Sequence, residues 1–228
     1  MTDVHSVDFL KKTNLYLVGM MGAGKTTIGR KLANRIGYQF FDTDDLIEQG
    51  AKQSIPEIFA SEGEAAFRAL ETQVLSQVSA YTKLVVATGG GIVTQPMNWS
   101  HLRHGVVIWL DVPNTVLISR LSGDTNRPLL KDVDLRTKLD GLLRDRGDLY
   151  AQADIHIGYE GKSIGKTCDR IIAALKQNLR PDQKMMADEI TINQASINTP
   201  VNPSVNLSVH PPVNSPVNPP DTSSSATA

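Results

Sequence analysis

The residue types and spacing that point most directly to chemistry lie in a glycine-rich segment near the N-terminus. It reads Gly19-Met-Met-Gly-Ala-Gly-Lys25-Thr26 and matches the G-x-x-x-x-G-K-[ST] pattern in every fixed position. Its glycines let backbone N–H groups turn towards an oxyanion, and a following helix would direct its positive end to the same place. Lys25 could then reach the β- and γ-phosphates, and the Thr26 hydroxyl could ligate Mg²⁺. The pattern therefore predicts a nucleoside triphosphate site.

This phosphate-binding loop, or P-loop, serves several classes of protein, so the acceptor has to be inferred from other residues. A GTPase usually carries an Asn-Lys-x-Asp element that recognises guanine, and this sequence has none. The domain is also small for a motor or a protein-remodelling machine. These observations favour a compact kinase that phosphorylates a small acceptor.

An acidic cluster follows the second predicted strand, in the segment Phe41-Asp42-Thr43-Asp44-Asp45. Along an extended chain Asp42 and Asp44 would lie on the same side, beyond the carboxyl end of the strand, where open parallel sheets bind ligands. One carboxylate near a metal and one near an acceptor hydroxyl would suit phosphoryl transfer. The alternative is that Asp42 or Asp44 merely caps a helix that continues through Leu46 and Ile47.

Three further features are candidates for the acceptor side. Gly89, Gly90 and Gly91 follow a buried strand and would let the backbone approach a ligand, although they could also form a plain turn. Arg68 and Arg146 could converge on a carboxylate, although each could equally be a solvated surface arginine.

The segment 122–132 is predicted to be a polar loop. An arginine on such a lid, Arg127, would neutralise the transferring phosphoryl group and exclude water as the loop closes. Arg120, just before this loop, is a candidate contact for the nucleotide base.

The apolar pattern predicts the elements that must position these residues. Short apolar runs, typical of strands covered on both faces, occur at 15–18, 38–41, 83–87, 106–110 and 155–157. Between them, apolar spacing, a Ser54-Ile-Pro-Glu57 capping box and helix-closing Gly37 predict helices, among them one starting at Pro113 and others at 135–143 and 164–179. Strands that alternate with helices predict an α/β fold with a parallel sheet and helices on both faces.

Composition sets the domain organisation and excludes several classes. The chain has 228 residues, a formal net charge of −1 and one cysteine, so neither a basic nucleic-acid-binding protein nor a disulfide framework is expected. Seven of the 12 prolines lie between residues 200 and 220, and Asp221 is the only charged residue from 190 onwards. We expect a flexible N-terminus at 1–11, one domain at 12–180 and a low-complexity, disordered tail at 181–228. No segment predicts a membrane span or a signal sequence, and a cytoplasmic location is expected.

Taken in order, these motifs resemble the shikimate kinase family over residues 12–180. The match consists of Gly19–Thr27, Asp42-Thr-Asp44, Phe67-Arg68, Thr88-Gly-Gly-Gly91, Arg127-Pro-Leu-Leu130 and Arg146 four residues before Tyr150. The resemblance implies transfer of the γ-phosphoryl group of ATP to the 3-hydroxyl of shikimate, in aromatic amino-acid biosynthesis, with Mg²⁺ as cofactor. It also implies a three-layer P-loop kinase fold, like that of nucleoside monophosphate kinases, with a five-stranded parallel sheet in the order 2-3-1-4-5 and a lid loop. A monomer with shikimate and ATP as its partners is expected.

Carried onto this sequence, the resemblance implies a role for each candidate residue. ATP would be held by Gly22, Ala23, Gly24, Lys25, Thr26, Thr27, Arg120 and the lid residue Arg127, and the metal by Thr26 with Asp42 in its outer shell. Shikimate would be held by Asp44, Arg68, Gly89, Gly90, Gly91 and Arg146. Lys25, Asp44 and Arg127 would be the catalytic residues, with the choice between a base and a positioning role for Asp44 left open.

Two other functions are compatible with parts of the sequence. The acceptor could be gluconate or a nucleotide, or the chain could be an ATP-binding module that docks a partner through its tail. One departure from the family pattern affects the local turn, since Gly147 and Asp148 stand where many relatives have a residue followed by proline.

Overall fold

The computed structural model describes residues 9–122 and 134–178, and the predicted tail, most of the predicted N-terminal segment and Arg127 lie outside these ranges. Leu10 precedes the predicted start of the domain at residue 12, yet it is buried in the core at 1% exposure. The packed part of the chain therefore includes Leu10. Within the described ranges, no helix combines the length and the apolar character that crossing a membrane requires.

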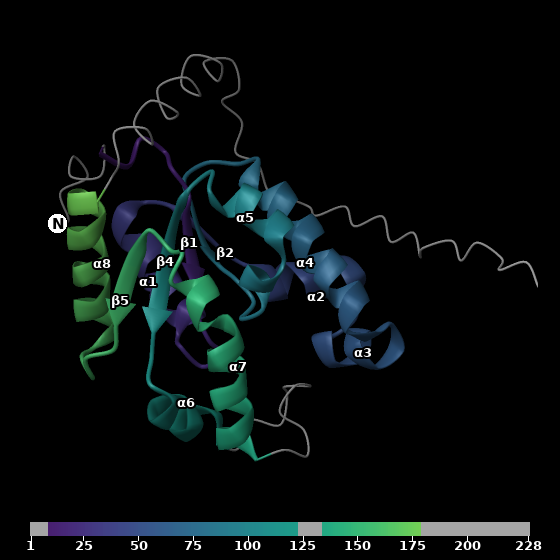
Figure 1. The fold of residues 1–228 in the computed structure, drawn as a ribbon. Helices are drawn as coiled ribbons and strands as arrows, with labels where there is room; N and C mark the ends of the chain where they lie inside the picture. Colours follow the sequence, from purple (N-terminus) through teal and green to yellow (C-terminus); the bar gives the residue numbers. More distant parts are fainter. Residues whose placement is uncertain (1–8, 123–133, 179–228) are drawn as a thin grey trace, which may run out of the picture.

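A five-stranded parallel sheet forms the centre of the molecule, in the order β2-β3-β1-β4-β5 (Figure 1). Its strands are β1 (Leu15–Val18), β2 (Gln39–Asp42), β3 (Leu84–Ala87), β4 (Val106–Asp111) and β5 (Ile155–Gly158). All four pairings are parallel, and in β1 Leu15 aligns with Val85 of β3 and Val106 of β4. The predicted fold class and strand order are confirmed, and each strand lies within one residue of its predicted bounds.

Helices cover both faces of this sheet. In Figure 1, α1 and α8 lie on one side of the strands, and α4, α5 and α7 lie on the other. The helices are α1 (Lys25–Ile36), α2 (Thr43–Ala51), α3 (Ile55–Ser61), α4 (Gly63–Ser79), α5 (Pro96–Leu102), α6 (Asn114–Leu121), α7 (Leu135–Tyr150) and α8 (Ile164–Asn178), with a 3-10 turn, η2 (Ile92–Thr94), before α5. The parallel β1, β3 and β4 direct their carboxyl ends, and so the loops that follow, to one edge of the sheet.

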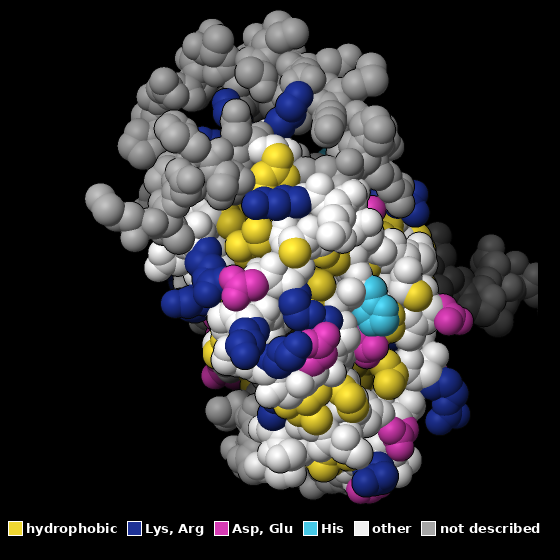
Figure 2. All heavy atoms as spheres, turned by 90° about the vertical axis from the view of Figure 1, so that its left-hand side faces the viewer, with side chains coloured by type: hydrophobic (Ala, Val, Ile, Leu, Met, Phe, Trp, Pro, Cys, Tyr) yellow, Lys and Arg dark blue, Asp and Glu magenta, His cyan; other side chains and the backbone are white. Residues whose placement is uncertain are grey.

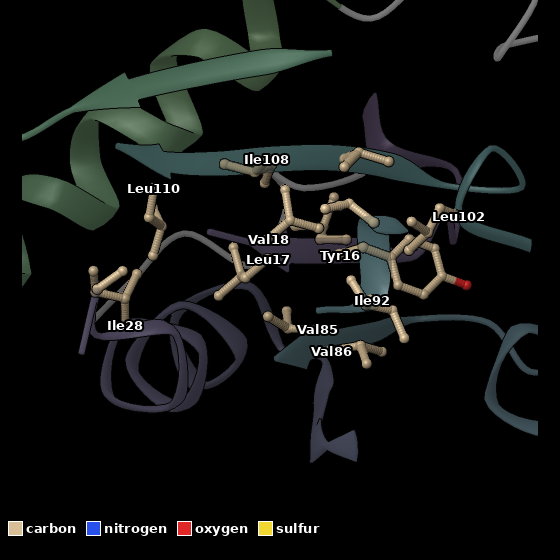
Figure 3. Packing of buried hydrophobic residues seen from close by; sticks show 14 of the residues in the cluster. Tyr16, Leu17, Val18, Ile28, Val85, Val86, Ile92, Leu102, Ile108 and Leu110 are labelled. Atoms are coloured by element: carbon tan, nitrogen blue, oxygen red, sulfur yellow. The ribbon is translucent and has the colours of Figure 1, made fainter. Parts of the chain in front are cut away.

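The core lies where β1 is covered on both faces, as the continuous apolar run of its residues predicts. All four residues of β1 are buried. Figure 3 shows Tyr16 beside Ile92 and Leu102, and Leu17 on the side of Ile28 in α1. Because this strand is packed from both faces, the loop that leaves its carboxyl end has a rigid base.

Two local predictions at helix ends are confirmed. Gly37 ends α1 in the left-handed conformation, with φ of 67°, and its N–H donates to the Ala33 carbonyl. Pro56 opens α3, where the Glu57 carboxylate accepts the Ser54 N–H at 2.7 Å as one half of the predicted capping box.

The sequence analysis misplaced the end of one helix and did not predict two others. The helix predicted at 135–143 continues through Gly147 to Tyr150. A helix-interior glycine costs roughly 1 kcal/mol relative to alanine, and the burial of Arg146 and Tyr150 outweighs that cost at Gly147. Neither α2 nor α5 was assigned from the sequence, although the capping alternative for Asp42 anticipated the start of α2.

The surface over α8 and β5 carries basic and acidic side chains side by side (Figure 2). Ion pairs join Arg35 with Asp169 at 2.5 Å and Arg170 with Glu160 at 3.0 Å. Interspersed charges of both signs are typical of a solvated helix face, so this surface gives no indication of a polyanionic partner.

Candidate active site

The predicted phosphate-binding loop lies between β1 and α1. Gly22 and Gly24 have φ of 75° and 95°, a region in which side chains are strained and glycine is favoured. The Lys25 ammonium donates to the carbonyls of Gly19 at 2.8 Å and Met20 at 2.9 Å. With 8% of its surface exposed, Lys25 is held at the start of α1, where the helix N-terminus favours an anion.

A cavity of about 450 Å³ adjoins this loop. Its lining includes the predicted nucleotide residues Gly22, Ala23, Gly24, Lys25, Thr26, Thr27 and Arg120, together with Asp42, Asp44 and Gly90. The phosphate-binding elements and part of the predicted acceptor side therefore share one cavity. Arg68, Arg146, Gly89 and Gly91 do not line it.

The acidic cluster stands opposite the start of α1. Thr26 Oγ1 donates to Asp42 Oδ2 at 2.7 Å, so a hydroxyl and a carboxylate lie side by side at the cavity. The predicted alternation of an extended chain is wrong at Asp44, because β2 ends at Asp42 and α2 begins at Thr43. Asp42 caps α2 by accepting the Asp44 N–H at 3.1 Å, yet Asp42 and Asp44 both line the cavity. Capping and a place in the site thus coexist at Asp42.

The three glycines make room mainly for protein side chains. A Cβ at Gly89 would overlap Glu71 Oε1 and lie 3.0 Å from Asp44 Oδ1, and a Cβ at Gly91 would overlap the Arg68 guanidinium. Gly90 instead faces the P-loop, since its Cβ would lie 3.4 Å from Met21 N. The glycine loop therefore lies between the cavity and the buried side chains of Arg68 and Glu71.

Both predicted carboxylate-binding arginines are buried, at 8% exposure for Arg68 and 7% for Arg146, so the solvated-surface alternative is wrong. Arg68 pairs with Glu71 at 2.5 Å and with Glu64 at 2.9 Å. Arg146 donates to the Gly90 carbonyl at 3.1 Å. The two guanidinium groups thus lie against successive residues of the glycine loop, of which Gly90 lines the cavity.

Arg120 connects the nucleotide loop with the segment after β5. Its Nη1 donates to the Gly22 carbonyl at 2.8 Å, and its guanidinium lies 5.4 Å from the ring centroid of Tyr159. Tyr159 and Ile164 also line the cavity, which gives it an apolar wall beyond the phosphate loop. The base-contact role expected of Arg120 is compatible with this position.

The sequence analysis assigned no role in the site to two residues, one of which, Tyr150, it named only as part of the family match. Glu71, fully buried, balances the charge of Arg68, and Tyr150, also fully buried, donates from its hydroxyl to the Gly90 carbonyl at 2.5 Å. The available signals were the i, i+3 spacing from Arg68 to Glu71 and the i, i+4 spacing from Arg146 to Tyr150, which place each pair on one helix face. Such spacings are common on solvated helices and therefore did not distinguish these pairs.

Burial raises the pKa of the Glu71 carboxyl above its ordinary value of 4.5, and the Arg68 guanidinium only partly opposes this. Because the native state holds this proton more tightly than the unfolded chain, the Glu71 contribution to stability is present at low pH and is lost as pH rises through the native pKa. We therefore expect the unfolding free energy of the wild type, relative to Glu71→Gln, to increase between about pH 7 and about pH 4.5. Urea unfolding of both proteins at the two pH values measures this difference, and a constant or decreasing difference contradicts the assignment.

A family model described as shikimate kinase matches residues 21–176. Among curated proteins, the shikimate kinase of Nostoc punctiforme is 51% identical over 173 residues, which cover 75% of this chain and 96% of the relative. The shikimate kinase of Thermosynechococcus vestitus is 56% identical over 169 residues, which cover 74% of this chain and 92% of the relative.

Solved structures give the same result. The chain is similar to shikimate kinase from Acinetobacter baumannii in complex with shikimate, with a TM-score of 0.73 and 40% identity, covering 77% of this chain and 99% of that one. Shikimate kinase from Aquifex aeolicus matches with a TM-score of 0.64 and 32% identity, over 72% of this chain and 97% of that one.

Proposed function

The chain belongs to the shikimate kinase family, and on that premise we propose which of its residues bind each substrate and which act in the transfer of the γ-phosphoryl group of ATP to shikimate. The chain is an ATP-dependent kinase whose products are shikimate 3-phosphate and ADP. These roles rest on one observation: Lys25 and Thr26 line the same cavity as Asp44 and Gly90. This membership argues against the alternative of a non-catalytic docking module.

The triphosphate is held by the amides of Gly22, Ala23 and Gly24 and by Lys25, with Thr27 and Arg120 completing the nucleotide side. The ammonium of Lys25 is held beside the phosphate-binding loop because it donates hydrogen bonds to the loop carbonyls of Gly19 and Met20. Its ammonium stabilises the charge that develops on the phosphoryl oxygens during transfer. The role of Arg127 as the lid arginine remains a proposal from the motif, since it lies outside the described residues.

The residues present fit Mg²⁺. Thr26 Oγ1 and Asp42 Oδ2 are adjacent oxygen donors at the cavity, and magnesium in kinases takes only one or two protein oxygens together with waters and phosphates. No group of three or more His, Cys, Asp or Glu side chains suited to a metal occurs in residues 9–122 and 134–178, which agrees with a site completed by the nucleotide. Thr26 would ligate the ion directly and Asp42 through its outer shell. The ion, when bound, neutralises phosphate charge.

On the acceptor side, Arg68 and Arg146 bind the shikimate carboxylate, and Asp44 binds hydroxyl groups of the ring. The backbone of Gly89, Gly90 and Gly91 packs beside the ring, with Gly90 nearest the P-loop. In the transfer, the 3-hydroxyl oxygen forms a bond to the γ-phosphorus and the bond to the β,γ-bridging oxygen breaks. The hydroxyl proton passes to the Asp44 carboxylate, and ADP leaves with the bridging oxygen.

Acceptor dependence tests this function. ADP release by the purified full-length chain is measured with ATP, Mg²⁺ and either shikimate, gluconate or a nucleoside monophosphate, with the no-acceptor rate as background. We expect turnover with shikimate alone, and mass spectrometry should find one phosphoryl group on the product. Background rates with shikimate from a folded protein would reject the proposal, and turnover with gluconate or the nucleotide would reassign the acceptor.

Replacement of Asp42 by asparagine tests the metal assignment. The amide keeps the shape and the capping oxygen of Asp42 but removes the charge that faces Mg²⁺. Outer-shell changes commonly weaken metal binding by about 10- to 100-fold, so we expect the Mg²⁺ concentration for half-maximal activity to rise about tenfold. The matched control is Asp45→Asn, because Asp45 is exposed and pairs with Arg30 at 3.4 Å. Equal magnesium requirements in the two variants would remove Asp42 from the metal site.

A further inference from the structure

Tyr150, the last residue of α7, is placed differently from a residue that only fills the core. Its side chain is fully buried, and its ring stacks on Trp109 of β4 at a centroid distance of 5.8 Å and an interplanar angle of 23°. This stacking restricts the ring, and the hydroxyl group reaches the Gly90 carbonyl at 2.5 Å. The tyrosine hydroxyl thus lies beside the glycine loop and not at the end of a closed apolar pocket.

The same carbonyl accepts a second hydrogen bond, from Arg146 Nη1 at 3.1 Å. Arg146 and Tyr150 are four residues apart on α7, so one helix face provides both donors, and together they use both lone pairs of the oxygen. Because the peptide group is planar, holding the carbonyl of Gly90 also sets the direction of the Gly91 N–H. Glycine would otherwise leave this backbone free to rotate. Burial raises the pKa of Tyr150 to about 12, so its hydroxyl remains a donor at physiological pH.

The peptide held in this way lies at the junction of the two halves of the site. Gly90 lines the cavity, and a Cβ on it would lie 3.4 Å from Met21 N and 3.6 Å from the Gly19 carbonyl. The Tyr150 hydroxyl also contacts Met20 Sδ at 3.7 Å. One phenol group therefore touches the glycine loop and the P-loop and shares its acceptor with the predicted carboxylate-binding arginine.

We propose that Tyr150 is a positioning residue for the acceptor, whose hydroxyl fixes the Gly90–Gly91 peptide and the Arg146 guanidinium in the orientation that binds shikimate. This inference rests on the proposed function, since it assigns Tyr150 to the acceptor side of that site. Tyr150 acts through Gly90 and Arg146 and has no chemical step of its own. Its loss should therefore affect the acceptor and leave the nucleotide largely unaffected.

The test is Tyr150→Phe, which keeps the ring and its stacking on Trp109 and removes one oxygen. Loss of one neutral hydrogen bond predicts a KM for shikimate about three- to tenfold higher, with the KM for ATP changed less than about twofold. The affinity for shikimate in the absence of ATP, measured by titration calorimetry, should fall by the same factor. Each protein is assayed well below its own thermal midpoint, so that a lower midpoint cannot account for the change in KM.

The matched control is Tyr16→Phe. Tyr16 is also fully buried among core residues (Figure 3), and its hydroxyl accepts a hydrogen bond from Asn14 Nδ2, in the residue before β1, at 3.5 Å. This variant should leave both KM values unchanged even if its thermal midpoint falls. The inference is overturned if Tyr150→Phe leaves the shikimate KM at the wild-type value, or if the KM values for ATP and shikimate rise equally. A wild type without shikimate-dependent turnover would instead overturn the proposed function, which separates the two failures.

Discussion

Replacing Lys25 with methionine is expected to lower kcat about 1000-fold at saturating ATP and shikimate. Removing one preorganised donor to charge that develops in a transition state typically costs about 10²- to 10³-fold, and here the group lost carries a full charge. Lys25 is 8% exposed and held by two loop carbonyls at 2.8 and 2.9 Å, so its ammonium is already in position before the nucleotide binds. Single-turnover measurements of ADP formation separate this loss from slower product release.

The control for Lys25 is Lys31→Met on the same helix. Lys31 is exposed on α1, so its replacement changes the net charge equally without altering the cavity. We expect wild-type kcat from this variant. A Lys25→Met protein that keeps more than about a tenth of the wild-type kcat would exclude transition-state stabilisation by Lys25, because even the weaker examples of such donors exceed that effect.

Replacing Arg146 with alanine is expected to weaken shikimate binding about 100-fold and ATP binding less than about threefold. Truncating one partner of a buried, hydrogen-bonded charge pair costs about 2–5 kcal/mol, and about 2.7 kcal/mol corresponds to 100-fold. Arg146 is 7% exposed and already anchored to the Gly90 carbonyl, so its guanidinium is oriented before the acceptor carboxylate arrives. Titration calorimetry with each ligand separately measures both affinities.

Arg144→Ala is the matched control, because Arg144 lies two residues earlier on α7 and is exposed. Its loss should leave both affinities near the wild-type values. If Arg146→Ala weakened ATP and shikimate binding equally, Arg146 would have to be removed from the acceptor side, and the proposal for Tyr150 would lose its premise.

Some parts of the site could be predicted because the residues that form them are contiguous. The P-loop is one example, since an apolar strand, a glycine-rich turn and an amphipathic helix follow each other within residues 15–36 and need no distant partner for their identification. Gly37 and the Ser54 capping box are others, because helix ends depend on backbone groups within a few residues. The strand order, in contrast, came from the family resemblance and not from the periodicity.

Other parts depended on contacts between residues far apart in the chain. In the sequence, Arg68 resembles any arginine on a helix surface. In the structure the glycine loop packs against its guanidinium, and Glu71 is its buried counter-charge. The end of α7 depends on distant contacts as well, because Tyr150 is buried against Trp109 of β4 and donates to the Gly90 carbonyl.

The sequence by itself determined the α/β class, the phosphate-binding loop and the list of candidate residues. These features depend on backbone preferences and side-chain chemistry of residues that are close together in the chain. Only the tertiary structure decided that Asp42 both caps α2 and faces Thr26, that two arginines are buried against successive glycines, and that Tyr150 holds the Gly90 carbonyl. The physical reason is that burial and hydrogen bonding across 16 to 60 residues arise from packing of the sheet and its helices. No local pattern encodes which distant groups that packing brings together.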